Sequence, residues 1–224
     1  MPPAIEDSLD LESLQRMPVF PLPGLVLLPG GLLPLHFFEP RYRDLARDCL
    51  ATNARCMVIA NIARDAGQAP VPELMPRACV GRVIEHHQNG DGTYDVLLEG
   101  VLRVSIEDID SPHAYRLVRA VPLRDRVPEQ GLPGNDCETA RSLVRDIASM
   151  AARRQVGFQV IAQDTDPPGL WVDRLAYQFV SDRAALQELL ETLDARARLD
   201  TVLHHLLDVR AKLQAASGTK RELD

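Results

Sequence analysis

The hydrophobic pattern of the chain changes once, near residue 124, from a period of two to a period of 3.6. Before this point short apolar runs alternate with polar residues, as in half-buried strands. After it, apolar residues recur three or four positions apart, as in amphipathic helices. The pattern therefore predicts an α+β protein in which a sheet precedes a helical subdomain.

The first long apolar stretch, residues 17–42, is interrupted by prolines and glycines. We predict short extended segments at 17–23 and 32–38. Their prolines confine them to sheet edges or strand ends, because proline lacks the N–H that a ladder requires. Pro29-Gly30-Gly31 predicts a turn between them. A helix is expected to open at Glu39-Pro40, since proline is tolerated in a first helical turn.

The clearest strand pattern spans residues 94–106, where the even positions are apolar and many odd positions are charged. Asn89-Gly90-Asp91-Gly92 precedes it and predicts a hairpin turn. Gly100 lies within the alternation without changing its phase. This favours a glycine bend over a β-bulge, because a bulge would exchange the two faces. Further strands are predicted at 56–63, 78–87 and 115–123, which together indicate a small, mostly antiparallel barrel or coiled sheet.

Helix caps organise the second half of the chain. Asp136, Ser181 and Asp194 are each placed to cap a helix, and a further helix carries Trp171 to Phe179. The whole chain is expected to divide into a flexible N-terminal arm (1–16), a β-barrel subdomain (17–123), a helical subdomain (124–215) and a frayed tail (216–224).

Composition and charge narrow the classes of partner. The hydrophobic fraction of 46% and the charged fraction of 25% are those of a globular protein. The net charge is −7, and neither half of the chain is basic. Because phosphate backbones are held mainly by Lys and Arg, we expect no nucleic-acid partner.

The sequence also bears on where the protein resides. The acidic N-terminus has the wrong polarity for a secretory signal, and the apolar stretches fall short of the ~20 residues that span a bilayer. Four scattered cysteines without a C-x-x-C pair are typical of thiols in a reducing compartment. We therefore expect a cytoplasmic protein without a membrane partner.

Catalytic motifs are missing from the sequence. It contains no Gly-Lys pair, and therefore no P-loop, and neither a G-x-S-x-G nor an H-E-x-x-H motif. A metal site assembled from distant residues such as Cys79 and His86 is disfavoured. We expect no catalytic residue, no metal ligand and no cofactor, and so a protein that is not an enzyme.

The run from Pro18 to Tyr42 closely resembles the opening of the Lon protease N-terminal (substrate-binding) domain family. Further similar pieces are Val80–Val83, Leu97–Arg103 and the L-x-x-L-L-E-x-x-D-x-x-x-R-L pattern at Leu186–Leu199. The resemblance implies a PUA-like β pseudo-barrel followed by a helical subdomain. It also implies recognition of protein segments, in a stand-alone form without the ATPase and protease domains.

A non-catalytic module that binds polypeptide segments, as an adaptor or holdase-like factor, is the leading hypothesis. Leu22, Leu25 and Leu28 are its candidate peptide-binding residues, because a loop flanked by Pro and Gly is the least certain to be buried. The alternatives are an RNA-binding PUA-like domain and a small-molecule pocket in the barrel. Whether the chain forms a homodimer is left open.

Overall fold

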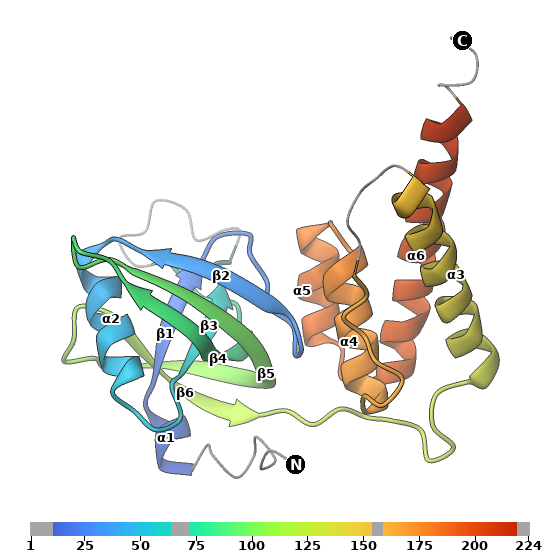
Figure 1. Ribbon diagram of the computed structural model, residues 1–224. Coiled ribbons are helices and arrows are strands. Elements are labelled where there is room, and N and C mark those ends of the chain that lie inside the picture. Colours follow the sequence, from blue (N-terminus) through green and yellow to red (C-terminus); the bar gives the residue numbers. More distant parts are fainter. Residues whose placement is uncertain (1–10, 64–71, 154–158, 219–224) are drawn as a thin grey trace. The chain divides into compact units, whose positions relative to one another are not determined.

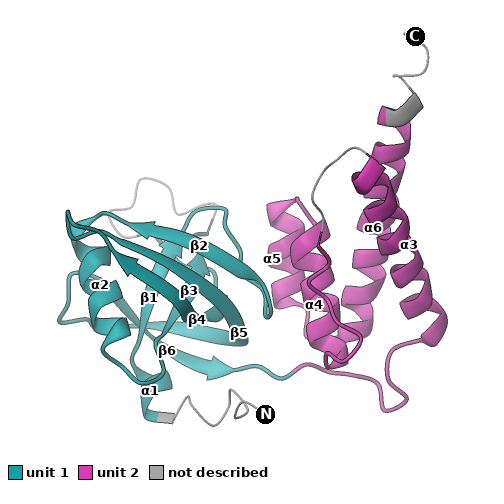
Figure 2. Ribbon diagram, viewed as in Figure 1, with its two compact units in different colours: residues 1–124 teal, residues 125–224 magenta. Residues whose placement is uncertain are grey.

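The computed structural model describes residues 11–63, 72–153 and 159–218. The chain forms two compact units, residues 1–124 and 125–224, which Figure 2 shows in separate colours. Each unit is described by itself below.

The first unit is built mainly of strands (Figure 1). Its elements in chain order are α1 (Leu11–Gln15), β1 (Met17–Leu22), β2 (Leu32–Phe37), α2 (Pro40–Leu50), β3 (Cys56–Asn61), β4 (Arg77–Gln88), β5 (Tyr94–Ile109) and β6 (Arg116–Pro122).

The six strands form one mixed sheet whose pairings close on themselves. The order is β2-β5-β4-β3-β1-β6, and β6 also pairs with β5, so five strands make a hydrogen-bonded ring. Only β1 and β3 run parallel, and the other pairs are antiparallel. The long strand β5 allows this closure because its first half pairs with β2 and its second half with β6. Closure removes exposed edges from the ring and leaves β2 outside it.

The interior of this unit is aliphatic, as expected from a sequence with few aromatic residues. β3 has five buried residues among its six, so it is covered on both faces. The main cluster joins the inner faces of the ring strands and α1, and its buried members are Leu14, Met17, Val19, Cys56, Val58, Ala60, Leu74, Ala78, Val80, Val104, Val118 and Ala120.

A small aromatic group fixes α2 against β1 and β2. The ring of Phe20 meets the edges of Phe37 and Tyr42, with centroids 4.8 and 4.5 Å apart. Phe37 is therefore directed inward, which turns its neighbour Phe38 to the opposite side of the chain.

The register at Gly100 corrects the prediction of a simple glycine bend. Gly81 pairs with Gly100 but Val80 pairs with Leu102, so β5 carries one extra residue here and contains a β-bulge. The alternation could not reveal the bulge, because Arg103 beyond it is also buried and both faces of the strand are covered.

Gly100 is also a point of close approach between strand and loop. Its N–H donates to the carbonyl of Gly31 at 2.9 Å, and its carbonyl accepts from the N–H of Gly30 at 2.7 Å. A Cβ at this position would collide with the carbonyl oxygen of Leu28. Glycine is thus required because the backbone of the loop between β1 and β2 packs directly on β5.

The second unit consists of four described helices: α3 (Gly134–Arg153), α4 (Pro168–Phe179), α5 (Arg183–Glu191) and α6 (Ala195–Gly218). The long helix α6 packs against α3 and α4. Asp194 caps α6 as predicted, because its Oδ1 accepts from the N–H groups of Arg196 and Ala197. Asp182, not Ser181, caps α5 by accepting from Ala185, and Asp136 lies inside the first turn of α3.

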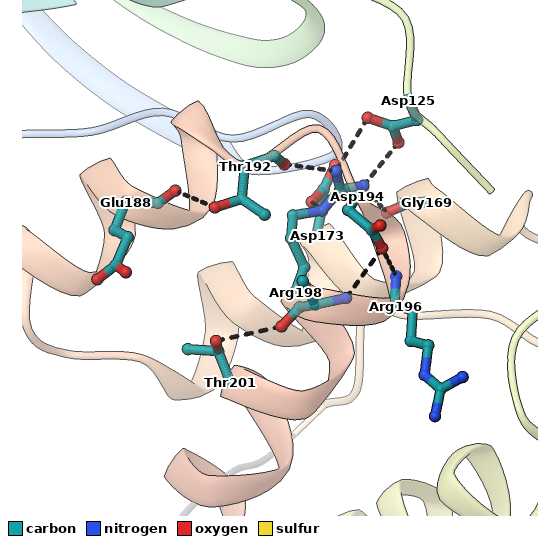
Figure 3. Close-up of polar contacts among 10 residues, drawn as sticks. Asp125, Gly169, Asp173, Glu188, Thr192, Asp194, Arg196, Arg198 and Thr201 are labelled. Carbon is teal, nitrogen blue, oxygen red and sulfur yellow. Dashed lines mark hydrogen bonds and ion pairs between the residues drawn. The ribbon is translucent and has the colours of Figure 1, made fainter. Parts of the chain in front are cut away.

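A buried guanidinium joins the start of this unit to its helices (Figure 3). Arg198 is fully buried, donates two hydrogen bonds to Asp125 at 2.6 and 3.0 Å, and lies 3.1 Å from Asp173. It also donates to the carbonyl of Thr192 at 2.8 Å. A Cβ at Gly169 would collide with the Asp125 carboxylate, so the glycine leaves room for this network.

Candidate functional site

The outward side of three adjacent strands in the first unit combines exposed apolar and charged side chains. Cross-strand rows follow from the register: Leu32–Glu99–Arg82, Pro34–Leu97–Glu85 and His36–Asp95–His87. We call these nine residues, together with Phe38 after β2, the β2–β5–β4 face. It is the outer surface of the sheet, because the alternate residues Leu33, Phe37 and Leu98 are buried.

A surface hollow of about 550 Å³ lies on this face. Its lining comes from β2, β4 and β5 and consists of Pro34, Leu35, His36, Glu85, His86, His87, Asp95, Val96 and Leu97. The floor is therefore partly aliphatic, with imidazole and carboxylate groups around it.

Large apolar side chains next to the hollow are open to solvent. Phe38, directly after β2, is 63% exposed and Leu32, the first residue of β2, is 43% exposed, although Phe37 of the same strand is buried. Ile84 of β4 is 42% exposed, at the irregularity where the β4 register shifts between Val83 and Glu85. The ring of Phe38 stacks on the ring of His36 with centroids 6.1 Å apart, which gives it a defined place at the edge of the face.

Asp95 is the most constrained acid of the face. Its two oxygens accept from Asn89 Nδ2 at 2.8 Å and contact His36 Nδ1 at 2.6 Å. The hydrogen bonds from Asn89 and then from His36 hold the pKa of Asp95 below its usual range. Asp95 is thus a fixed negative charge beside the hollow.

Arg82 and Glu99 form an ion pair at 3.3 Å in the first of the three rows. Glu85, in the next row, has no hydrogen bond or ion pair within the described ranges 11–63, 72–153 and 159–218. With neutral histidines, three carboxylates and one guanidinium give the face a net charge of −2.

The free edge of β2 is poorly suited to the addition of another strand. The carbonyl of Gly31 accepts from the N–H of Gly100. By the alternation of an antiparallel pair, the backbone N–H and C=O groups of the odd-numbered residues of β2 therefore bond to β5, and those of the even-numbered residues point away from β5. Pro34 is at the middle of this outer edge and has no N–H to donate. Proline in an edge strand disfavours edge-to-edge pairing, so the face offers side chains rather than a ladder.

The three residues predicted to bind a peptide lie outside the hollow. Leu28 is fully buried, and its carbonyl oxygen packs on Gly100, so a peptide cannot reach it in this structure. Leu22 and Leu25 are half-buried, and their contact with a peptide stays a prediction. The loop was chosen because a segment flanked by Pro and Gly is the least certain to be buried, but backbone contacts with β5 hold its last residues inside.

Phe38 and Leu32 are the residues that sequence reasoning missed. Phe38 was not among the candidate peptide-binding residues, whereas it is exposed on the outer side of the strand. A strand phase in which Leu33 and Phe37 point inward would have placed both residues outside. That phase was not distinguishable in a run where almost every residue is apolar.

A second cavity, of about 300 Å³, lies under α1 in the same unit. Its residues are Ser13, Arg16, Met17, Pro18, Asp48, Cys49, Thr52, Ala54, Cys56, His113, Tyr115 and Leu117. Tyr115 donates to Asp48 at 2.9 Å, and burial together with this bond raises the pKa of Tyr115. Burial raises the pKa of Cys49 to about 12 and of Cys56 to about 11, so both are protonated thiols and poor nucleophiles.

Metal ligands do not gather anywhere in the described part of the chain: no three His, Cys, Asp or Glu side chains are placed to share an ion. Cys79 and His86 do not meet, because Cys79 is buried inside the sheet and His86 is exposed. No helix among the described residues is long and apolar enough to cross a bilayer.

Comparison with known proteins identifies similar sequences and folds. Residues 16–208 match the family model of the ATP-dependent protease La (LON) substrate-binding domain. The chain is 26% identical to Lon protease 2 of Sorangium cellulosum, over 92% of this chain and 27% of that protein. It is 24% identical to Lon protease 2 of Syntrophobacter fumaroxidans, over 90% of this chain and 25% of that protein. The chain thus spans about a quarter of the length of these relatives.

Two solved structures share the fold. The N-terminal domain of Mycobacterium avium complex Lon protease superposes with a TM-score of 0.62 at 18% identity, covering 87% of this chain and 99% of that one. The Lon N-terminal domain protein from Xanthomonas campestris gives 0.63 at 22% identity, covering 85% and 98%. The α+β class predicted from the sequence is confirmed by these structures.

Proposed function

The chain belongs to the family of ATP-dependent protease La (LON) substrate-binding domains, and we propose that it binds segments of polypeptide chain without catalysing a reaction. Its role would be that of an adaptor or a holdase-like factor. The four cysteines are thiols, which supports the further proposal of a reducing, cytoplasmic location.

The exposed apolar residues of the β2–β5–β4 face carry this proposal. Leu32, Pro34 and Phe38 follow one another on the same side of β2, next to the hollow of about 550 Å³. Apolar side chains of an unfolded segment would lose contact with water on this surface, at about 25 cal/mol per Å² of apolar area buried. Apolar contacts of this kind do not require one exact ligand sequence, which suits a module that binds varied polypeptides.

The face favours recognition through side chains over strand addition, because Pro34 removes a donor from the edge of β2. The half-buried Leu22 and Leu25 stay proposed as additional contacts. Leu28 does not, since its side chain is part of the core.

The RNA-binding alternative has less support. The face has three carboxylates and one arginine, and that arginine is paired with Glu99. A phosphate backbone would meet net negative charge there, which opposes binding.

Binding of a fluorescent, permanently unfolded polypeptide to the full chain tests the proposal. The double variant Leu32→Ser, Phe38→Ser removes two exposed apolar side chains without opening the core. Their loss is expected to weaken binding at least about tenfold, equivalent to ~1.4 kcal/mol. Fluorescence anisotropy measures the dissociation constant, and circular dichroism checks that the variant is folded.

The matched control is Val121→Ser on β6, which removes an exposed apolar side chain (52% exposed) elsewhere in the same unit. It should leave the affinity unchanged. Equal affinities of wild type and double variant would refute the assignment to this face, and no binding by the wild type would refute the proposed function.

A further inference from the structure

We propose that the β2–β5–β4 face selects polypeptide segments in which Lys or Arg stands next to a large apolar residue. The inference rests on the proposed function and specifies the class of segment that is bound. It follows from the position of two carboxylates relative to the apolar part of the face.

The first carboxylate, Glu85, is in the same cross-strand row as Leu97 and Pro34. Directly opposed side chains on a sheet have Cβ atoms about 4.5–5.5 Å apart. An apolar side chain seated on Leu97 and Pro34 therefore has a carboxylate at its side. Glu85 has no hydrogen bond or ion pair with any residue that the structure describes, so its charge is available to a ligand.

The second carboxylate, Asp95, is one row further along, about 7 Å from Leu97 because each strand residue advances the chain ~3.4 Å. Asn89 and His36 fix its orientation and keep it ionised. His36 and Asn89 contact different oxygens of Asp95, and the Asp95 side chain remains 54% exposed. A cation in the hollow can therefore approach it.

The third carboxylate does not contribute to this preference. Glu99 is paired with Arg82 at 3.3 Å, and both side chains are about one third exposed or less. The unbalanced charge is thus on Glu85 and Asp95, which both line the hollow together with Pro34 and Leu97. A segment with acidic residues beside its apolar residue meets repulsion from both.

The size of the preference follows from the exposure of these groups. Exposed ion pairs each contribute about 0.2–1 kcal/mol, so pairs with both carboxylates correspond to an affinity about two- to thirtyfold higher for a basic segment than for a neutral one. Salt screens such pairs, so the preference should shrink as the ionic strength rises towards 1 M.

Three peptides of equal length and with the same central Leu-Phe pair test the inference, flanked by Lys, Gln or Glu. Fluorescence anisotropy with the full chain should rank them Lys above Gln above Glu. In Glu85→Gln and Asp95→Asn the Lys peptide should approach the Gln peptide in affinity, while the Gln peptide keeps its own. Glu129→Gln, an exposed carboxylate of the second unit, changes the net charge equally and should leave the ranking intact.

The outcomes separate the two proposals. Equal affinity for all three peptides overturns the charge preference and leaves polypeptide binding standing. A Lys preference that survives in both Glu85→Gln and Asp95→Asn overturns its assignment to this face. If none of the peptides, nor the unfolded polypeptide, binds to the wild type, the proposed function fails and the inference with it.

Discussion

Single residues decide how the loop between β1 and β2 meets the sheet. Because Gly100 has no side chain, the backbone of Gly30 and Gly31 can form hydrogen bonds with it directly. Leu28 of the same loop is buried. The adjacent Phe37 and Phe38 differ as sharply: the first is 1% exposed and the second 63%. The residues of the candidate site are thus decided by which of two neighbouring side chains, such as Phe37 and Phe38, faces the core.

Gly100→Ala tests the close approach at the bulge. The added Cβ would collide with the carbonyl oxygen of Leu28, a backbone atom that cannot rotate away. We expect a loss of about 2–3 kcal/mol in the free energy of unfolding of the first unit, as for other overpacked sites. Urea unfolding followed by far-UV circular dichroism measures it.

Gly90→Ala is the control for this substitution, since a Cβ there meets nothing within 4 Å. Its effect on unfolding should be small. If Gly100→Ala and Gly90→Ala unfold at the same urea concentration, the loop does not press on β5 as described.

At the scale of elements, the ends of strands and helices carry most of the specific polar chemistry. β2 lies outside the ring of strands, and its outer edge contains Pro34, which has no N–H to donate. The helices of the second unit begin at side-chain caps: Asp182 for α5 and Asp194 for α6. Hydrogen bonds from N–H groups favour the ionised form of a cap carboxylate, so the start of α6 at Asp194 depends on pH.

Asp194→Asn tests this pH dependence. The N–H of Ala197, and also that of Arg196, lowers the pKa of Asp194. A lowered pKa contributes stability above the unfolded value, ~3.9, and this contribution disappears as pH falls through the folded value. The stability difference between wild type and Asp194→Asn should therefore be constant from pH 7 to 5 and diminish below about pH 4.

Fluorescence of Trp171, the single tryptophan, follows unfolding of the second unit in urea at each pH. Asp200→Asn removes the same charge from the same helix but no cap hydrogen bond. The same pH profile in both variants would contradict the capping explanation.

At the scale of the whole molecule, the chain forms two units, each with its own buried interior. The first is held by an aliphatic sheet core, and the second has a buried ionic group at Arg198. Each unit has internal contacts of its own, and the boundary falls between Arg124 and Asp125, next to the change of sequence period. The candidate site belongs entirely to the first unit.

Arg198→Met should therefore destabilise the second unit alone. Removing the guanidinium leaves Asp125 and Asp173 without their buried partner, which typically costs about 3–5 kcal/mol. Trp171 fluorescence measures the loss, and hydrogen exchange in β3 and β4 should be unchanged. Arg145→Met, which breaks only the exposed pair with Glu138, should cost no more than about 1 kcal/mol. A loss for Arg198→Met as small as this control would contradict the role of the network.

The sequence by itself determined the strands, most of the helices, the α+β class and the family, because periodicity, turns and motifs are local properties of the chain. Helix α1 was not among them: residues 1–16 were expected to be a flexible arm, whereas Leu14 packs into the sheet core. The tertiary structure alone decided the closure of β6 on β5, the bulge at Gly100 and the outward side of β2. It also decided the Asp125–Arg198 pair, whose partners are 73 residues apart. These features join segments distant in sequence, and in the apolar run of residues 17–42 no alternation distinguishes core from surface. For this reason the buried Leu28 was chosen as a peptide-binding residue and the exposed Phe38 was not.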